Sequence, residues 1–370
     1  MKFTCEKMQL EEAVRLVSKA ASPKSPIDAL KGILIRAGSD LRLTCYDLRR
    51  AIYTDIDADI KDGGSVVVNA RLFTDVIRNM PDGLVTVSVN EDFEMLIKCG
   101  VTEYTLTTIS GDEYPELPEM DRERKLDIPQ NILSSMIQDT IFAVSTNESR
   151  PVYMGSLFEI ENGTMTIVSV DGFRLALRKE SIDHGGSDTL RFIVPAYALS
   201  DIEKICSDSE ETMSLSIGTK HISASVGNTV IITRRLEGDF LSHEKAVPRD
   251  FKSKFKINKA DLARAIDRVS TILVDGEKKP IKLVFGDGEI NLSCRTAVSR
   301  SVDSCICEGS AEDVEIGFND NYLRDALKAI NEEEILFCIN TGSSPCVIKS
   351  AGDDESYLHM VLPVRLSPGN

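Results

Sequence analysis

The four histidines are the residues best suited to acid–base chemistry at neutral pH, and they lie in unrelated sequence contexts. They are His184, His221, His243 and His359. None of them neighbours a serine or cysteine in the arrangement that exposes a nucleophile on a sharp turn. Aspartate and glutamate are abundant, 59 of 370 residues, but they lack the spacing of metal ligands. The sequence therefore predicts no catalytic centre and no cofactor.

The nine cysteines form no metal or redox motif. Cys305 and Cys307 are separated by one residue, and the chain contains no Cys-x-x-Cys. Most of the nine are expected to be reduced and buried. Gly172 and Gly286 lie in turn-like contexts rather than in a phosphate-binding loop. An undetected enzyme stays open as an alternative, and it would need a deep polar pocket with convergent titratable groups.

An amphipathic segment occurs three times at nearly constant spacing. Each copy ends in a Val-Ser pair, at 17–18, 144–145 and 269–270, which are 127 and 125 residues apart. Residues at i, i+3, i+4 and i+7 share one face of a helix. These positions are Leu10, Ala13, Val14 and Val17, then Ile137, Thr140, Ile141 and Val144, then Leu262, Ala265, Ile266 and Val269.

A second block recurs with offsets of 126 and 124 residues. Its members are Phe73, Asp75 and Val76, then Leu199, Asp201 and Ile202, then Leu323, Asp325 and Ala326. Two blocks in register at one period indicate three tandem copies of one domain. We predict boundaries at 1–126, 127–250 and 251–370. Three copies of one shape favour a curved or ring-like scaffold over an enzyme.

Each copy is predicted to be an α+β unit with two helices and mostly antiparallel strands joined by short turns. Apolar runs or alternation predict strands, for example at 31–37, 41–45 and 51–60. Asn69 is expected to cap the second helix, and Pro195 and Asn319 take its place in the later copies. The six predicted helices cover residues 10–24, 70–80, 130–143, 196–206, 258–269 and 321–330.

Charge is unevenly distributed between the predicted helices and the rest of the chain. The six helices carry 11 basic and 9 acidic residues, a net +2, whereas the whole chain carries −16. The remaining residues therefore carry −18. A general preference of helix surfaces for Lys and Arg explains the same difference equally well.

The chain has neither of the two sequence signs of membrane targeting. No apolar run approaches the ~20 residues of a membrane span. Residues 1–6 lack the pattern of a secretory signal. A cytoplasmic location without a membrane partner is therefore expected.

Four short segments stand out along this frame. They are 111–115 (Gly-Asp-Glu-Tyr-Pro), 170–176 (Val-Asp-Gly-Phe-Arg-Leu-Ala), 236–240 (Leu-Glu-Gly-Asp-Phe) and 362–366 (Leu-Pro-Val-Arg-Leu). Together with the opening Met-Lys-Phe-Thr, they resemble the bacterial sliding-clamp family, the beta subunit of DNA polymerase III. The resemblance covers the whole chain and keeps the three-domain spacing.

The resemblance implies a non-catalytic processivity factor that encircles duplex DNA. Such clamps are head-to-tail homodimers whose six domains form a ring, with helices lining the hole and sheets outside. A modestly basic lining would contact phosphates without reading bases, which permits sliding. The DNA-facing candidates are Arg15, Lys19, Lys24, Arg71, Arg78, Arg150, Lys204, Lys259, Arg264, Arg268, Arg324 and Lys328.

The resemblance also implies an apolar cleft between the second and third domains. It would take short peptides from the replicative polymerase, the clamp loader and repair proteins. The matching residues are Tyr153, Val170, Gly172, Phe173, Arg174, Leu175, Leu241, Asn319, Tyr322, Pro345, Met360, Val361, Leu362, Pro363, Val364, Arg365 and Leu366. Ordinary strand core is an alternative interpretation of Leu175 and Val361.

Three positions depart from the family pattern around this cleft. Phe173 stands where a histidine is often found, Leu241 where proline is common, and Lys278 where some members have an aromatic residue. These departures leave the peptide preference open.

The family dimer pairs an edge strand of domain one with an edge strand of domain three. Tyr104 and Leu106 match one side, and Ile272 and Leu273 match the other. The apolar run at 272–274 follows a predicted helix directly, which indicates an interface or a buried local turn. An adaptor of the same fold that binds protein without encircling DNA is the main alternative function, because copy two has few basic residues.

Overall fold

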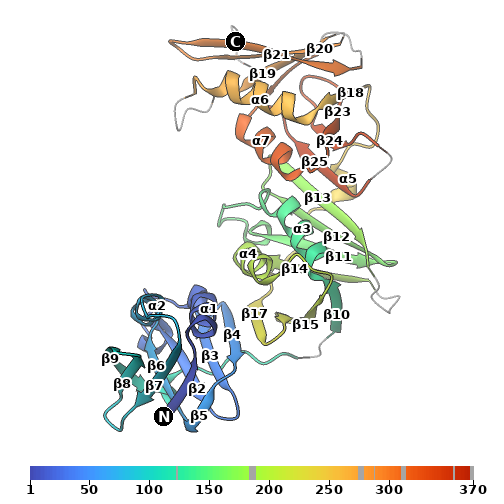
Figure 1. Ribbon diagram of the computed structural model, residues 1–370. Helices are drawn as coiled ribbons and strands as arrows, with labels where there is room; N and C mark the ends of the chain where they lie inside the picture. Colours follow the sequence, from blue (N-terminus) through green and yellow to red (C-terminus); the bar gives the residue numbers. More distant parts are fainter. Residues whose placement is uncertain are drawn as a thin grey trace. The chain divides into compact units, whose positions relative to one another are not determined.

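The structure, a computed structural model, describes residues 1–121, 124–182, 189–273, 279–286, 288–309, 314–352 and 355–366. His184, Val274 and Lys278 lie outside the described residues. The chain divides into two compact units. The first holds residues 1–131 and 201–235, and the second holds 132–200 and 236–370. Each unit is described by itself below (Figure 1).

The α-helices agree closely with the six predicted, and the described residues add one short helix. They are α1 (Lys7–Val17), α2 (Ala70–Arg78), α3 (Gln130–Ile141), α4 (Ala196–Ile205), α5 (His243–Ala246), α6 (Lys259–Ser270) and α7 (Asp320–Ala329). Short 3₁₀ helices are η1 (Ser18–Ala20), η2 (Asp28–Lys31), η3 (Gly111–Glu113) and η4 (Pro151–Tyr153). None of the described helices has the length and apolarity needed to cross a membrane.

The predicted asparagine caps are confirmed. The Asn69 side chain accepts a 3.0 Å hydrogen bond from the backbone N–H of Leu72. Asn319 accepts one of 3.0 Å from Asn321. These bonds satisfy N–H groups that have no partner within the first turn of a helix.

The first helix is shorter than predicted. It ends at Val17, and η1 follows, so that Lys24 lies beyond the helix rather than in it. The Ser18 hydroxyl bonds back to the Val14 carbonyl, and Pro23 disfavours helical backbone at the residue before it. The segment 51–60, predicted as one strand, forms two strands, β4 (Arg50–Ile56) and β5 (Asp59–Asp62).

The helical repeat in copy two was assigned four residues too late. Val144 lies past the end of α3, and the side chains of Ile141 and Val144 are only half-buried. The buried stripe of α3 is Leu133, Met136, Ile137 and Thr140. A shift of four residues is about one helical turn, so it leaves the pattern on almost the same face. The first residues of α1, α3 and α6 are therefore 123 and 129 residues apart.

The first unit is built on one antiparallel sheet of 13 strands among its described residues. Helices α1 and α2 pack on each other, and α1 covers β3 and β4. The spatial order is β10 (Arg124–Pro129), β15 (Thr212–Ile217), β16 (His221–Val226), β17 (Thr229–Arg234), β4 (Arg50–Ile56), β3 (Leu41–Tyr46), β2 (Gly32–Ala37), β6 (Gly64–Asn69), β9 (Thr102–Ser110), β8 (Glu94–Cys99), β7 (Leu84–Val89), β1 (Lys2–Glu6) and β5 (Asp59–Asp62).

The second unit has an antiparallel sheet of 12 strands among its described residues. Helices α6 and α7 pack on each other, and α6 covers β20 and β21. The order is β14 (Leu190–Pro195), β11 (Gly155–Glu161), β12 (Thr164–Val170), β13 (Arg174–Ser181), β25 (Tyr357–Val361), β24 (Cys346–Ser350), β23 (Glu334–Ile339), β18 (Ser253–Asn258), β21 (Arg300–Glu308), β20 (Glu289–Arg295), β19 (Ile281–Phe285) and β22 (Val314–Phe318).

Each sheet runs without a break from one copy of the repeat into the next. In the first unit, β17 of copy two pairs with β4 of copy one over residues 229–233 and 50–54. In the second unit, β25 of copy three pairs with β13 of copy two over residues 357–361 and 174–178. The compact units therefore do not follow the repeat boundaries, because backbone hydrogen bonds join neighbouring copies.

Besides the strands at the ends of the two sheets, two strands within them, β9 and β21, have an open edge over part of their length. Residues 102–107 of β9 pair with β8, and residues 108–110 pair with β6 instead. Residues 300–306 of β21 pair with β20, whereas only Cys307 and Glu308 pair with β18. Among the described residues, the other side of 102–107 in β9 and of 300–306 in β21 has no strand partner.

Candidate functional site

The predicted cleft residues come together at one end of β13, within the second unit. Arg174 and Leu175 begin β13 and face Val361 and Met360 of β25. The N–H of Leu362 then donates to the carbonyl of Phe173 at 2.8 Å. The β12–β13 turn and the end of β25 therefore form a single surface. This is the geometry that the cleft prediction needs.

Four of the predicted cleft residues are strand core. Val170, Leu175, Met360 and Val361 are each 6 % exposed or less. The first three belong to one apolar cluster, against which the Tyr153 side chain also packs. Tyr153 contacts the ring of Phe240 edge-on, with 5.3 Å between the ring centroids. These residues can support a bound peptide from below but expose little surface to it.

Three apolar side chains of the predicted cleft are exposed instead. Phe173, Leu241 and Val364 are 59 %, 36 % and 38 % exposed. The Phe173 ring stacks at 6.2 Å on the ring of Tyr322 in α7. Exposed apolar side chains beside buried ones are typical of a surface that a partner covers.

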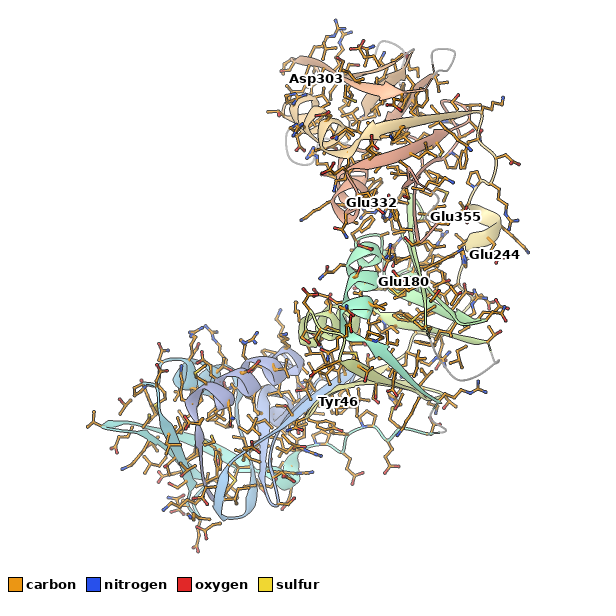
Figure 2. All side chains as sticks on the ribbon, turned by 45° about the vertical axis from the view of Figure 1, so that its right-hand side comes forward. Tyr46, Glu180, Glu244, Asp303, Glu332 and Glu355 are labelled. Carbon is orange, nitrogen blue, oxygen red and sulfur yellow. The ribbon has the colours of Figure 1, made fainter. Side chains whose placement is uncertain are left out.

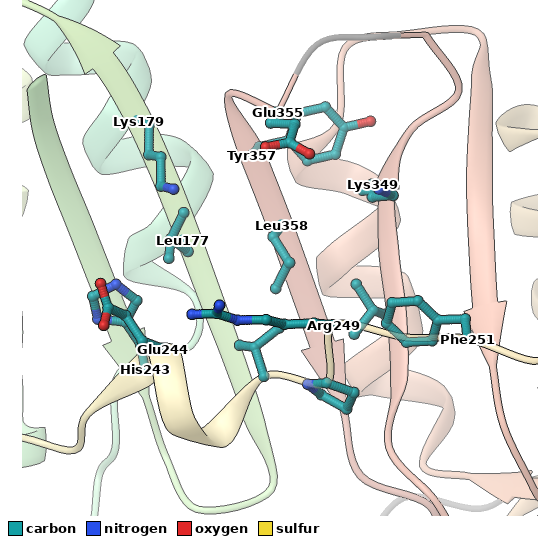
Figure 3. A pocket seen from close by; sticks show the side chains of 13 residues that line it. Leu177, Lys179, His243, Glu244, Arg249, Phe251, Lys349, Glu355, Tyr357 and Leu358 are labelled. Carbon is teal, nitrogen blue, oxygen red and sulfur yellow. The ribbon is translucent and has the colours of Figure 1, made fainter.

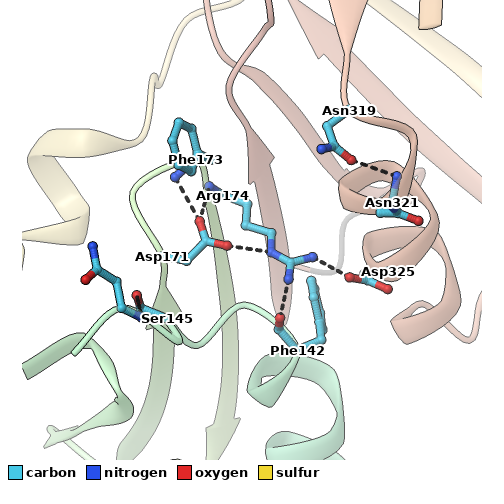
Figure 4. Close-up of polar contacts among 9 residues, drawn as sticks. Phe142, Ser145, Asp171, Phe173, Arg174, Asn319, Asn321 and Asp325 are labelled. Carbon is cyan, nitrogen blue, oxygen red and sulfur yellow. Dashed lines mark hydrogen bonds and ion pairs between the residues drawn. The ribbon is translucent and has the colours of Figure 1, made fainter. Parts of the chain in front are cut away.

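The Arg174 side chain contacts two carboxylates, a backbone carbonyl and an aromatic ring of its own chain (Figure 4). Its guanidinium donates to Asp171 at 3.0 Å, to Asp325 at 2.5 Å and to the Phe142 carbonyl at 2.6 Å. It also lies over the ring of Tyr322, 4.7 Å from the centroid. Each of its three guanidinium nitrogens therefore already donates a hydrogen bond within the chain, so Arg174 has a structural role in the predicted cleft.

The segment after β25 is fixed by a close backbone approach. The N–H of Val364 donates to the Gly317 carbonyl at 2.8 Å. A Cβ on Gly317 would lie 2.6 Å from the Val364 carbonyl oxygen, so only glycine fits there. Residues 363–366 then line a shallow pocket with Glu315, Gly342 and Ser343. Of the remaining predicted residues, Pro345 is half-buried, and the side-chain oxygen of Asn319 is used as a helix cap.

Sequence reasoning missed a pocket of about 440 Å³ on the same face of β13 and β25. Leu177 and Leu358 lie there, two residues along from Leu175 and Met360. Lys179 and Arg249 add positive charge (Figure 3). Glu244 and Glu355, which Figure 2 labels on the whole chain, also line this pocket (Figure 3). The lining comes from four segments, so the only sequence signal was the alternation at 175, 177 and 179.

Half of the predicted DNA-facing cations are exposed and have no ion pair among the described residues. A cation of this kind is available to a phosphate without giving up an existing partner. The six are Arg15, Lys24, Arg71, Arg150, Lys204 and Lys328.

The other six candidates are engaged within the chain. Burial lowers the pKa of Lys19, and the nearby Asp201 opposes that effect. Lys259 donates to the Ile330 carbonyl, close to the end of α7. The remaining four form ion pairs: Arg78 with Asp75, Arg264 with Asp261, Arg268 with Asp303, and Arg324 with Asp320 and Asp267. Phosphate contacts by these side chains would require exchange of partners.

The predicted dimer residues differ in exposure. Tyr104 is 37 % exposed on the open edge of β9, and Leu106 is buried there. Ile272 and Leu273 are half-buried and pack against the apolar core that α6 and α7 cover.

The open edge of β21 is a stronger interface candidate that sequence reasoning missed. Val302 and Ile306 are 63 % and 81 % exposed on it. Alternating apolar residues on an unpaired edge favour strand addition, which native proteins otherwise prevent. The alternation at 302, 304 and 306 includes a serine, which weakened the signal in the sequence.

Comparison with known proteins agrees with this geometry. Profiles of the N-terminal, central and C-terminal domains of the DNA polymerase III beta subunit match residues 1–118, 127–241 and 244–365. The beta sliding clamp of Staphylococcus epidermidis is 33 % identical, and that of Staphylococcus aureus is 32 % identical, each over 99 % of both chains. A crystal structure of the DNA polymerase sliding clamp from Bacillus subtilis is 29 % identical, with a TM-score of 0.95 over 99 % of this chain and all of that one.

The three profiles cover the chain in the order and spacing of its three repeats, and the relatives match it from end to end. The chain therefore belongs to the family of the DNA polymerase III beta subunit, the bacterial beta sliding clamps.

Proposed function

We propose that this chain is a non-catalytic processivity factor that closes into a ring of two copies around duplex DNA. The ring tethers the replicative polymerase, the clamp loader and repair proteins to DNA. The observation that carries this proposal is the pair of open edges on β9 and β21. Neighbouring copies within the chain are joined by strand pairing, and these two edges are left without such a pairing.

The repeat predicts how these edges are used. The last strand of copy two, β17, pairs with β4 of copy one, and the last strand of copy three, β25, pairs with β13 of copy two. The last strand of copy one is β9, and the strand of copy three that corresponds to β4 and β13 is β21. Pairing of β21 with β9 of a second copy would repeat the same joint head to tail. Two such joints close a six-domain ring.

A ring needs only weak contact with the DNA that it surrounds. The six candidate cations without an ion pair in the part of the chain that the structure describes can contact phosphates, and the net charge of −16 discourages binding elsewhere. Contacts to phosphates carry no sequence information, so they permit sliding.

The surface around Phe173, Leu241 and Val364 is the proposed peptide site. An extended peptide with apolar anchors would cover these side chains, with the buried Leu175 and Met360 beneath them. We also propose a cytoplasmic location and domain boundaries after residues 126 and 250.

Retention on DNA of different topology tests the ring. The protein is loaded onto nicked circular DNA, and half of the sample is then cut once with a restriction enzyme. We expect retention on the circle and rapid loss from the linear product. Equal retention on both would contradict encirclement and favour an adaptor that binds without enclosing DNA.

Fluorescence anisotropy with a labelled peptide that carries a Leu-Phe anchor tests the peptide site. Phe173→Ala combined with Val364→Ala should weaken binding at least ~10-fold, because the substitutions remove two exposed apolar side chains that the peptide would cover. Leu84→Ala, an exposed apolar residue in domain one, is the matched control. Unchanged affinity in the double variant would exclude this surface.

A further inference from the structure

The pocket of about 440 Å³ on β13, β24 and β25 continues the surface proposed for the peptide. Two rows of paired side chains cross these three strands: the first is Leu175, Met360 and Val347, and the second is Leu177, Leu358 and Lys349. Residues two apart on a strand point to the same face and lie about 7 Å from each other. The first row lies beneath the proposed peptide site, and the second row lines the pocket. A peptide anchored on the first row therefore reaches the pocket within a few residues.

One short segment borders both the peptide site and the pocket. It begins at Leu241, an exposed residue of the peptide site, and continues into α5. In α5, His243 Nδ1 lies 3.3 Å from the Glu159 carboxylate of β11. After α5, Val247 and Phe251 pack on the apolar cluster of β13 and β25. The segment is therefore held over the sheet, where it forms one wall of the pocket.

Three cations line the pocket, and each comes from a different segment. Lys179 lies on β13, Lys349 on β24 and Arg249 in the segment after α5 (Figure 3). Lys179 and Arg249 are exposed, and Lys349 is half-buried. None of the three has a side-chain hydrogen bond or ion pair within the residues that the structure describes. Since the whole chain carries −16, three such cations around one space are a local departure from its overall charge.

The acidic residues of the lining do not neutralise these cations. Glu244 and Glu355 are both exposed, and neither forms an ion pair with another described residue. The described lining thus has three full positive charges and two negative ones, around the apolar side chains of Leu177 and Leu358. A ligand that places carboxylates near the cations and carbon atoms over the leucines matches this lining.

The pocket lies on the face of β13 that points away from α3. Successive side chains of a strand point to opposite faces. Leu177 and Lys179 line the pocket, whereas Arg178 between them lies 3.6 Å from Asp139 of α3. In the proposed ring, DNA lies on the side of the helices, so the pocket is out of its reach. This favours an acidic protein segment over a nucleic acid as the ligand.

We propose that this pocket receives acidic residues of the same partner peptide whose apolar anchor covers Phe173, Leu241 and Val364. The inference rests on the proposed peptide site and adds a charge preference to it. An extended peptide advances about 3.3 Å per residue, so acidic residues about two to four positions from the anchor reach the pocket. A single exposed ion pair contributes little, but here three cations surround one space.

Matched peptides test the charge preference. Each carries the Leu-Phe anchor, with two aspartates or two asparagines placed at this spacing either before or after it. Fluorescence anisotropy with the full-length protein gives the dissociation constants. At low ionic strength, we expect one of the two aspartate peptides to bind at least ~5-fold more tightly than its asparagine counterpart. This preference should shrink as salt is added, because ions screen exposed charges.

Variants at the three cations locate the effect. Combining Lys179→Gln, Arg249→Gln and Lys349→Gln should bring the affinities of the aspartate and asparagine peptides to within about 2-fold of each other. The matched control removes three exposed lysines of the first unit and should keep the preference; its substitutions are Lys2→Gln, Lys125→Gln and Lys220→Gln. Glutamates at the three pocket positions should instead favour a peptide with two lysines. Circular dichroism checks that each variant is folded.

The outcomes separate the pocket from the peptide site. Equal affinity of the aspartate and asparagine peptides at both placements would overturn the pocket and leave the peptide site intact. A preference that persists in the triple glutamine variant, or that the control variant loses equally, would do the same. Absence of binding by every peptide would overturn the proposed peptide site and the pocket with it. So would a Phe173→Ala, Val364→Ala variant that binds the asparagine peptide as tightly as the unmodified protein.

Discussion

Arg174 contributes more to the folded chain than to a bound peptide. Its guanidinium has two carboxylates and one carbonyl as partners, and its side chain is 12 % exposed. Removing a largely buried cation leaves its acidic partners without compensation. This explains why an arginine stands at the edge of an otherwise apolar cleft.

We predict that Arg174→Ala lowers the free energy of unfolding by about 2–4 kcal/mol, because the variant lacks the charge-assisted hydrogen bonds to Asp171 and Asp325. Urea denaturation measures the change. Arg264→Ala is the control, since among the described residues this exposed side chain pairs only with Asp261, and its removal should cost less than about 0.5 kcal/mol. Equal effects of the two substitutions would contradict the structural role.

His359 is expected to make the free energy of unfolding depend on pH. It is buried between Phe142 and Tyr357, and neither of its ring nitrogens has a hydrogen-bond partner among the described residues. Burial, reinforced by the positive charge of Arg178, lowers the pKa of His359 to about 3. The unfolded chain therefore binds a proton near pH 6.5 that the folded chain does not.

Stability should accordingly fall as the pH falls from about 6.5 towards 3, with a slope of up to about 1.4 kcal/mol per pH unit from this residue. Urea midpoints of the unmodified protein and of His359→Phe at pH 7, 6 and 5 measure it. The difference between the two proteins isolates the histidine from the carboxylates. Parallel pH profiles would contradict a neutral, buried His359.

At the scale of elements, the proposed dimer depends on the open edges of β9 and β21. Ile272 and Leu273 pack on the core, so charges placed there would damage the domain as well as a dimer. Ile306 on the open edge of β21 separates the two effects, since its side chain is 81 % exposed.

Ile306→Lys should therefore raise the dimer dissociation constant at least ~10-fold, while the melting temperature changes little. Sedimentation velocity and differential scanning fluorimetry follow the two quantities. Leu84→Lys places the same charge at an exposed position of β7 and should affect neither. A dimer as tight as the unmodified one would show that β21 lies outside the interface.

At the scale of the whole molecule, the charge distribution has to limit non-specific DNA binding and still accommodate DNA inside the proposed ring. A net charge of −16 keeps DNA from binding at random, while the ring interior must tolerate a polyanion. We propose that the six candidate cations that have no ion pair among the described residues meet the second need. Each one that contacts a phosphate contributes to the salt dependence of DNA binding.

We predict that Arg15→Ala with Arg71→Ala lowers the slope of log affinity against log salt by about 1 for each phosphate that the variant no longer neutralises. Anisotropy of labelled duplex DNA over a range of potassium chloride concentrations gives this slope. Arg264→Ala should change it less, because Asp261 already neutralises that side chain. Identical slopes for all three proteins would place the two cations away from DNA.

Much of the fold follows from the sequence because it depends on local pattern. The three copies, the helix positions and the Asn69 and Asn319 caps depend on periodicity and on single side chains near their own backbone. The register of α3 was wrong by four residues for the same reason, because a pattern that repeats every turn does not distinguish one turn from the next.

The sequence by itself determined the triplicated α+β design and the family, and it predicted the segments of the proposed cleft. Only the tertiary structure decided which of those residues are free to act. It buries Leu175 and Val361, pairs Arg174 with Asp171 and Asp325, and leaves Phe173 exposed. It also exposes Ile306, which the sequence had not singled out. Exposure and pairing depend on partners far away in the chain, such as Asp325 for Arg174, and no local pattern contains that information.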